Sequence, residues 1–334
     1  MKVRVVGTGS IGTRYLRILT AMHERGELED RPRAVPVGGV LREDDLRERV
    51  IVEDIDAPSR PSVDLTIIAT QTARHVSDAQ AFADSTARLL IEKPVATSTT
   101  QAATLATTAR GVPTAVCAPL RFLRGFAMTK EALTTIGEVT QVQVWCRSWL
   151  PDWRPGSDHR RSYAADPAQG GVLRDLVHDI DIALALFGMP VTVTATCSVD
   201  PVLDIPVETT ADMQWTYEGF TLHMLLDYVS PVPTRGLRVT GSAGTVDWDI
   251  LAGTVRSSVG GTAQDPATFP GDLDRDAILM TQVLAAAAEA GTPASYACAR
   301  LADGMRALAI TEFAKTSSAS GSRPVAVTIA KDRR

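Results

Sequence analysis

The chain has 334 residues, of which 45% are hydrophobic and 22% are charged. That balance is typical of a globular protein and excludes a disordered or fibrous chain. The length predicts two domains at roughly 150 residues each. The net charge of −5 disfavours a nucleic-acid partner, because such proteins usually carry a basic face. No apolar run approaches the ~20 residues that span a bilayer, and Met1-Lys2 leads straight into an apolar run. We therefore expect no membrane partner, no signal peptide and a cytoplasmic protein.

The four cysteines are widely separated, and none forms a Cys-x-x-Cys pair. This spacing disfavours a disulfide framework or a zinc site, so we expect four reduced, mostly buried thiols and no metal. The residues are Cys117, Cys146, Cys197 and Cys298.

The first half of the chain alternates short apolar runs with helical patterns. The predicted strands cover residues 3–6, 35–41, 65–69, 89–91 and 114–118, and the predicted helices cover 11–25, 75–87 and 99–110. Strands that alternate with helices predict parallel βαβ units in a doubly wound Rossmann sheet. We assign this domain to residues 1–120.

After residue 120 the pattern changes to consecutive strands. These are predicted at residues 139–147, 191–198, 209–216, 220–226, 237–240 and 245–247, with a helix at 172–187. Helices at 272–290 and 299–316, a Ser/Gly segment at 317–322 and a strand at 325–329 close the chain. Consecutive strands favour antiparallel pairing, so residues 121–334 are predicted to form an α+β domain with an open, mainly antiparallel sheet. The fold class is α/β.

Residues 7–12 read Gly-Thr-Gly-Ser-Ile-Gly and fit the Gly-x-Gly-x-x-Gly pattern between a strand and a helix. Gly7 allows the tight turn, Gly9 lets a pyrophosphate approach the backbone, and Gly12 lets the helix pack on the strand. Ser10 and Ile11 begin the helix whose amides face the phosphates. A glycine-rich turn without a ligand is the alternative.

The end of the second predicted strand usually carries an acid for the ribose of NAD. Here the first polar residue is Arg42, whose guanidinium suits a 2′-phosphate, so the cofactor is NADP or NAD with NADP favoured. The adjacent Glu43 is an alternative ribose ligand, and both side chains could simply be solvated.

Glu92-Lys93-Pro94 follows a buried strand at the carboxyl edge of the sheet, where ligands bind in open α/β folds. Lys93 there can polarise a carbonyl or share a proton relay near the nicotinamide. A surface lysine is the alternative.

The predicted helix at 172–187 has one apolar face, and Asp175, His178 and Asp181 lie within an arc of about 120° on the other side. His178 among carboxylates can act as the general base for an alcohol. The alternatives are a solvated polar face or a metal site, although one histidine with acids is a poor set for zinc.

The segment 149–163 combines aromatic residues, prolines and arginines, which favours a structured loop near a polar ligand. We assign Trp153, Arg160 and Tyr163 to substrate binding, and an ordinary packed loop is the alternative. Asp175 and Asp181 of the predicted helix are assigned to substrate binding as well. His159 in this loop is the second candidate for the catalytic histidine.

In this order the motifs resemble the glucose–fructose oxidoreductase/inositol dehydrogenase (Gfo/Idh/MocA) family over nearly the whole chain. The resemblance also covers the strand ending at Thr70 with His75, the Leu120-Arg121-Phe122 step, residues 136–139 and residues 239–246. It implies that Lys93 and His178 flank the reacting carbon. It further implies that Thr70, His75, Glu92 and Lys93 line the cofactor site and that Arg121 belongs to the substrate site. The family usually places an aspartate four residues before the histidine, whereas Arg174 stands there and Asp175 lies three before, which leaves the role of Asp175 open.

The function predicted is hydride transfer between NAD(P) and a secondary alcohol or ketone carbon of a sugar, cyclitol or sugar conjugate. Unusual-sugar or secondary-metabolite biosynthesis is the suggested context, and a homo-oligomer, dimer or tetramer, through the C-terminal sheet is expected. The alternatives are a reductase of a non-sugar carbonyl or imine, and an NADP-binding sensor without turnover. Lys93 together with His178 favours an enzyme.

Overall fold

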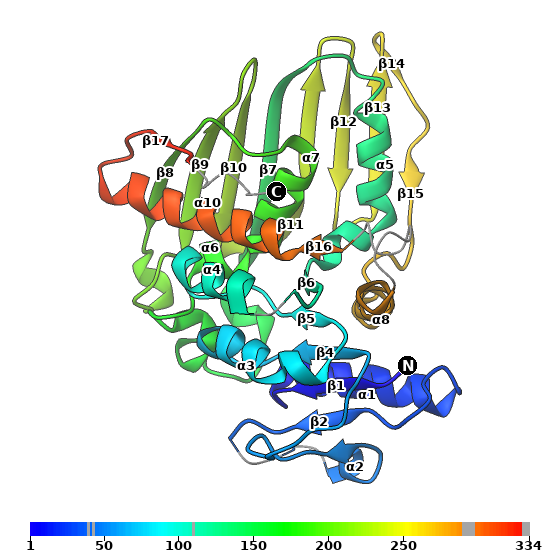
Figure 1. The fold of residues 1–334 in the computed structure, drawn as a ribbon. Coiled ribbons are helices and arrows are strands. Elements are labelled where there is room, and N and C mark those ends of the chain that lie inside the picture. The colour runs from blue at the N-terminus through cyan, green and yellow to red at the C-terminus, as the bar shows by residue number, and fades with distance from the viewer. Residues whose placement is uncertain (39–40, 42–43, 109–110, 289–297, 329–334) are drawn as a thin grey trace. The chain divides into compact units, whose positions relative to one another are not determined.

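The structure is a computed structural model that describes residues 1–38, 41, 44–108, 111–288 and 298–328. The chain forms two compact units (Figure 1). The first combines Met1–Phe122 with Asp274–Met305, and the second combines Leu123–Leu273 with Arg306–Arg334. A single boundary at residue 120 therefore misses the return of residues 274–305 to the first unit.

The first unit is built on a seven-stranded sheet with the order β16-β6-β5-β4-β1-β2-β3. The strands are β1 (Val3–Val6), β2 (Arg33–Val35), β3 (Ile51–Val52), β4 (Leu65–Ile68), β5 (Leu89–Ile91), β6 (Thr114–Val116) and β16 (Ala299–Arg300). All the pairs are parallel except β16 with β6 at one edge. The strands β1, β4 and β5 are buried throughout, as parallel strands covered on both faces must be. This confirms the predicted doubly wound sheet.

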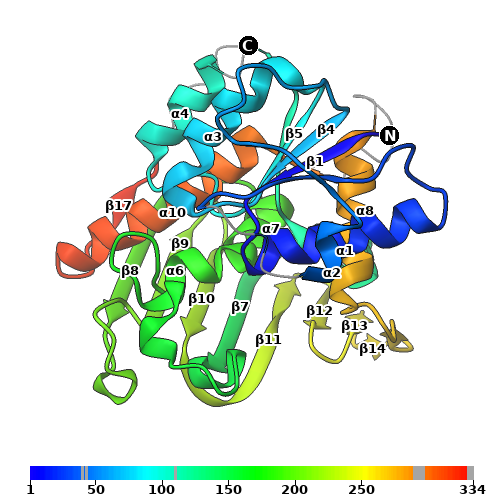
Figure 2. The ribbon, with the colours of Figure 1, turned by 90° about the horizontal axis from the view of Figure 1, so that it is seen from below.

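Helices cover both faces of this sheet (Figure 2). Val3 and Val5 of β1 share a hydrophobic core with α1 (Ser10–Glu24) and with α8 (Arg275–Ala287), which the late return of the chain supplies. On the other face lie α3 (His75–Phe82) and α4 (Thr99–Thr108), while the short α2 (Asp44–Arg47) lies between β2 and β3 in the chain. The carboxyl ends of β1, β4 and β5 lead directly into the predicted cofactor motifs.

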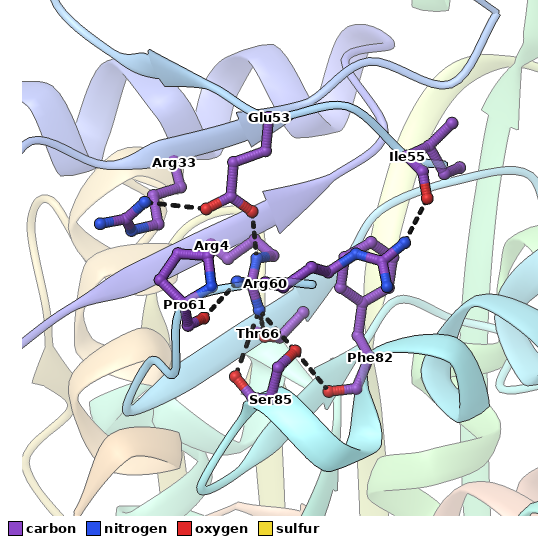
Figure 3. Close-up of polar contacts among 9 residues, drawn as sticks. All are labelled: Arg4, Arg33, Glu53, Ile55, Arg60, Pro61, Thr66, Phe82 and Ser85. Carbon is purple, nitrogen blue, oxygen red and sulfur yellow. Dashed lines mark hydrogen bonds and ion pairs between the residues drawn. The ribbon is translucent and has the colours of Figure 1, made fainter. Parts of the chain in front are cut away.

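A buried arginine interrupts the apolar pattern of β1 (Figure 3). Arg4 is fully buried, and its Nε donates to Glu53 Oε2 at 2.6 Å while Arg33 Nη1 donates to the other carboxylate oxygen at 2.9 Å. Its remaining donors reach Pro61 O at 2.7 Å, Ser85 Oγ at 3.1 Å, Ser85 O at 3.3 Å and Thr66 Oγ1 at 3.4 Å. The Phe82 ring lies beneath the guanidinium with its centroid 5.3 Å from Arg4 Cζ. The network joins β1 to β4, to α3 and to the segment after β3.

The second unit holds a ten-stranded open sheet with the order β14-β13-β12-β11-β7-β10-β9-β8-β17, and β15 pairs with β13 beside this path. The strands are β7 (Val139–Trp149), β8 (Thr192–Ser198), β9 (Thr210–Thr216), β10 (Thr221–Asp227), β11 (Val229–Gly241), β12 (Gly244–Asp249), β13 (Thr254–Val259), β14 (Thr262–Ala263), β15 (Ala267–Thr268) and β17 (Val325–Ala326). Among the strands that the structure describes in this sheet, only β7 and β10 pair in parallel. The predicted open, mainly antiparallel sheet is confirmed.

The helices of this unit are α5 (Arg124–Ala132), α6 (Val172–Asp175) and α7 (Val177–Phe187), and α10 (Leu301–Ala319) begins in the first unit and ends in the second. A bidentate ion pair holds α7 on the sheet: Arg235 of β11 donates from Nε and Nη2 to Asp179 at 2.9 and 2.8 Å. Burial alone lowers the pKa of Arg235, but Asp179 outweighs this and raises the pKa above its usual value. Asp179 is fully buried, and its carboxylate stabilises the packing of α7 on the sheet through this ion pair.

Several predicted elements differ from the structure. The predicted strand 35–41 is observed as β2 at Arg33–Val35, because Pro36 follows and cannot donate to the sheet. The predicted helix 172–187 is two helices, since Leu176 leaves helical geometry at φ −92° and ψ 22°. The helix α5 and the strands β13 to β15 were not predicted.

The C-terminal segment also differs from expectation. The predicted helix 299–316 begins only after β16, and it continues to Ala319 into the predicted Ser/Gly loop. Ser317 Oγ accepts from Ala195 N and Ser318 Oγ accepts from Cys197 N, both at 2.9 Å, so the serines dock the helix on β8. Ile329, the end of the predicted last strand, lies outside the described residues.

Candidate active site

The glycine loop joins β1 to α1, and two of its three glycines are required by packing. Gly7 has φ +94°, and a Cβ there would lie 2.7 Å from Ala69 O. A Cβ on Gly12 would collide with the carbonyl oxygen of Gly7. A Cβ on Gly9, in contrast, would have no heavy atom within 4 Å. Nothing in the described chain demands a glycine at position 9, which fits a residue kept small for a ligand.

The start of α1 offers hydrogen-bond donors to that open space. Gly9 is the N-cap, and no side chain caps the helix there, so the amides of the first turn at Ser10 and Ile11 carry the positive end of the helix dipole. The Thr70 hydroxyl, at the end of β4, is a buried polar atom with no hydrogen-bond partner within the described residues. Uncapped amides and an orphaned hydroxyl beside an open cradle fit the pyrophosphate of a dinucleotide.

Glu92 joins the glycine-loop helix to Lys93. Its Oε1 accepts from Tyr15 Oη of α1 at 2.9 Å, and its Oε2 accepts from the Lys93 backbone N–H at 3.2 Å. Burial raises the pKa of Tyr15, and the neighbouring Cys117 and Glu92 raise it further. This phenol therefore remains a neutral donor. The sequence did not single out Tyr15, because its partner is 77 residues away.

His75 supports the same segment from another side. It is 1% exposed, and its Nδ1 lies 2.9 Å from Pro94 O and its Nε2 3.1 Å from Thr70 O. Burial lowers the pKa of this imidazole, so the ring is neutral and donates to one of the two carbonyls. His75 therefore ties the end of β4 to the turn at Lys93–Pro94, whose peptide bond is cis.

The carboxylates around His178 are buried rather than solvated. Asp175 and Asp181 are each 5% exposed, while His178 is half-buried. Tyr228 Oη donates to Asp175 Oδ2 at 2.6 Å, and burial together with this carboxylate raises the pKa of the phenol. The solvated polar face considered from the sequence is therefore wrong. The bond to Tyr228 also coincides with the break at Leu176, which separates Asp175 from the helix of His178.

The loop between β7 and α6 forms a pocket of about 360 Å³, within the range of small-ligand sites. Its lining includes Trp153, Tyr163 and Asp175, which the sequence assigned to substrate binding, together with three residues not assigned from the sequence, namely Arg154, Arg161 and Ser157. His159, the second candidate histidine, also lines it, and its Nε2 lies 2.8 Å from Leu203 O.

Two predicted arginines lie elsewhere. Arg160 is not among the lining residues, because its guanidinium pairs with Asp158 at 2.9 Å and with Asp204 at 3.5 Å. Arg121 belongs to the first unit, where its Nη1 lies 3.4 Å from Asp303 Oδ2. Arg42 and Glu43, on which the cofactor preference depended, lie outside the described residues. Lys93 belongs to the first unit and His178 to the second.

Comparison with known sequences decides the family. A sequence model of an oxidoreductase family with an NAD-binding Rossmann fold matches residues 1–117, and a model of the GFO/IDH/MocA C-terminal domain matches residues 126–247. The chain belongs to the Gfo/Idh/MocA family. It is thus an oxidoreductase with an NAD-binding Rossmann domain, as the motifs predicted. No curated protein matched the chain.

Solved structures share this Gfo/Idh/MocA fold along the whole chain. Levoglucosan dehydrogenase in complex with NADH superposes with a TM-score of 0.80 at 15% identity, covering 99% of this chain and 100% of that one. Aldose-aldose oxidoreductase from Caulobacter crescentus, complexed with glycerol, gives 0.75 at 20% identity with 98% and 99% coverage. GenD2 from gentamicin A biosynthesis, in complex with NAD, gives 0.75 at 22% identity with 98% and 97% coverage.

Within the described part of the chain, no helix is both long and apolar enough to cross a membrane, and no group of three His, Cys, Asp or Glu side chains is placed to hold a metal ion. All four cysteines are free, and three of them are buried, as predicted.

Proposed function

We propose that the protein transfers a hydride between NAD(P) and a secondary alcohol or ketone carbon of a sugar, cyclitol or sugar conjugate. The observation that carries this proposal is the open space at Gly9 beside the uncapped start of α1. Packing explains the glycines at positions 7 and 12, whereas packing does not explain Gly9 and a bound dinucleotide would. The bound dinucleotide would supply the hydride chemistry, and the chain's own residues would bind, orient and exchange a proton.

Lys93 and His178 are the proposed proton-handling residues. Lys93 follows β5 at the carboxyl edge of the sheet, where its backbone is held by Glu92. His178 is half-buried near the start of α7, and an imidazole side chain suits proton exchange with an alcohol. The preference for NADP over NAD that Arg42 suggests remains part of the proposal.

The pocket in the second unit is the proposed substrate side. Trp153 and Tyr163 offer exposed aromatic faces, and Asp175 offers a carboxylate held by Tyr228. The names of the structural neighbours support a sugar, since they include levoglucosan dehydrogenase and an aldose-aldose oxidoreductase. A neighbour from gentamicin A biosynthesis is compatible with a biosynthetic role. We further propose that the open sheet of the second unit forms a homo-oligomer.

The test is substitution of Gly9, with NAD⁺ and NADP⁺ titrated by calorimetry. Gly9→Ala and Gly9→Val should fold, because the space is open and φ is −73°, with a loss of about 1 kcal/mol for an apolar N-cap. Dinucleotide affinity should be reduced in Gly9→Ala and reduced further in Gly9→Val, which has the larger side chain. Gly12→Ala should instead disrupt folding, because a Cβ there collides with Gly7 O. Unchanged affinity in a folded Gly9→Val protein would refute the assignment of the loop. The wild-type titrations also decide between NAD and NADP.

A further inference from the structure

Two arginines on the pocket wall have no acidic partner among the residues that the structure describes. Arg154 and Arg161 both line the pocket and are exposed, and no carboxylate in the described part of the chain pairs with either guanidinium. Arg160, which lies beside Arg161 in sequence, is neutralised by Asp158 and Asp204. The loop therefore presents two guanidinium groups to the pocket, and neither is paired with a carboxylate of the described residues.

The acids of the pocket do not offset this charge. Asp158 accepts from Arg160 Nε at 2.9 Å and Nη2 at 3.1 Å, and these bonds hold the pKa of its carboxyl below the usual value. Asp175, the other lining carboxylate, accepts from Tyr228. The Asp158–Arg160 ion pair has no net charge, so the pocket lining retains two guanidinium groups, of Arg154 and Arg161, and one carboxylate, of Asp175. The chain as a whole has a net charge of −5. The pocket is locally cationic in an acidic protein, which favours an anionic ligand.

Aromatic rings stand next to these arginines. Trp153 is 41% exposed and Tyr163 37% exposed, although both line a pocket. Trp153 is fixed by a bond from Nε1 to Ser148 Oγ at 2.9 Å and by an edge contact with the Tyr228 ring at 5.3 Å. A rigid ring of this kind gives an apolar face to the C–H groups of a sugar without losing much side-chain entropy on binding.

We infer that this pocket takes a carbohydrate that carries a carboxylate or phosphate group, with Arg154 and Arg161 binding the oxyanion and Trp153 packing against the sugar ring. The inference rests on the proposed function, in which the pocket is the substrate side of an oxidoreductase. Guanidinium groups suit both oxyanions, because their fork of donors matches carboxylate and phosphate geometry. A sugar acid and a sugar phosphate would each supply an oxyanion that these guanidinium groups can bind.

The experiment compares charged and uncharged versions of one sugar. D-glucose, D-glucuronate and D-glucose 6-phosphate are titrated by calorimetry into the full-length protein saturated with dinucleotide, and the same three are assayed for dinucleotide reduction by absorbance. We expect one anionic sugar to bind at least about tenfold more tightly than glucose, with an affinity that falls as NaCl is added. The anionic sugar that binds more tightly shows whether the pocket prefers a carboxylate or a phosphate group.

Variants assign the effect to the arginines. Arg154→Gln and Arg161→Gln should each reduce affinity for the anionic sugar by about tenfold while glucose binding is unchanged, and Arg161→Lys should recover part of the loss. Arg323→Gln removes an exposed arginine of the same unit outside the pocket, and it should change neither affinity. A loss common to charged and uncharged sugars would contradict the inference.

The outcomes separate this inference from the proposed function. Turnover of glucose or another neutral sugar, without preference for the anions, overturns the inference and leaves the oxidoreductase standing. Tight, arginine-dependent binding of an anionic sugar that is never oxidised or reduced supports the inference and contradicts the proposed catalysis. Binding of none of the three sugars to the dinucleotide-saturated protein overturns the inference.

Discussion

Replacement of Arg4 by methionine should destabilise the first unit by about 3 kcal/mol. Removing one partner of a buried ion pair costs about 3–5 kcal/mol, because the other charge is left uncompensated. Here Glu53 keeps its bond to Arg33 at 2.9 Å, which places the loss at the lower end of that range. The freed acceptors at Pro61 and Ser85 lie on residues that are not fully buried, so water can reach them. Methionine fills a similar length above Phe82, which limits any cavity.

The position of the tryptophans lets the two units be followed separately. All five lie in the second unit, at Trp145, Trp149, Trp153, Trp215 and Trp248, so tryptophan fluorescence follows that unit. Calorimetric scans and amide exchange at β1 and β4 follow the first. At about 2–4 °C per kcal/mol for a unit of this size, Arg4→Met should lower its midpoint by about 6–12 °C. The fluorescence transition should move less.

Two controls make the reasoning refutable. Arg33→Met removes one bond at the edge of the network, where the side chain is 16% exposed, and it should cost only about 1 kcal/mol. Adding Glu53→Gln to Arg4→Met should recover stability relative to Arg4→Met alone, since no charged carboxylate remains. If Arg4→Met shifts the first unit by no more than Arg33→Met does, the buried network is not what holds β1 to β4 and α3.

Two further predictions concern chemistry and pH. His178→Ala and Lys93→Ala should each lower kcat by about 10²- to 10⁴-fold, while calorimetry shows that both variants still bind the dinucleotide. A larger loss in His159→Ala than in His178→Ala would identify the other histidine as the catalytic one. Burial raises the pKa of Cys197 and Cys298 to about 11, and it also raises the pKa of Cys117 and Cys146. Thiols of an unfolded chain have a pKa near 8.5, so they ionise at a lower pH than the buried thiols of the folded chain. The free energy of unfolding should therefore be unchanged below about pH 8.5 and fall as the pH rises toward 11. Urea unfolding at pH 8, 9 and 10 measures this loss.

The parallel sheet could be predicted because strands covered on both faces leave a continuous apolar signal. Residues 3–6, 65–68 and 89–91 carry that signal, and Arg4 within the first run gives no hint of its burial. Its partners Glu53 and Ser85 lie 49 and 81 residues away, so only the folded chain brings them together. The break at Leu176 was missed for the same reason, since the bond from Tyr228 to Asp175 spans 53 residues.

In the loop of residues 149–163, the sequence predicted which residue types take part, but it could not predict in which direction each side chain points. Residues His159–Arg161 form one turn of 3₁₀ helix, in which successive side chains diverge by about 120°. Arg160 therefore faces Asp158 and Asp204 while Arg161 lines the pocket. Sequence spacing without the turn type cannot distinguish these neighbours, and nothing in the spacing marks Arg154 as a residue of the pocket wall.

The backbone on both sides of Lys93 is held by buried side chains of the first unit. The backbone before it is held by Glu92, whose carboxylate also accepts from Tyr15 three residues after the last glycine of the loop. The backbone after it is held at Pro94 by His75, which also contacts Thr70 beside Gly7. Burial keeps Tyr15 and His75 neutral, so neither contact depends on a charge that would titrate near neutral pH. The glycine loop and the backbone of Lys93 are thereby parts of one buried framework. Packing therefore sets the distance between the proposed phosphate-binding turn and the backbone of the proposed proton-handling residue, as preorganised sites on rigid elements require.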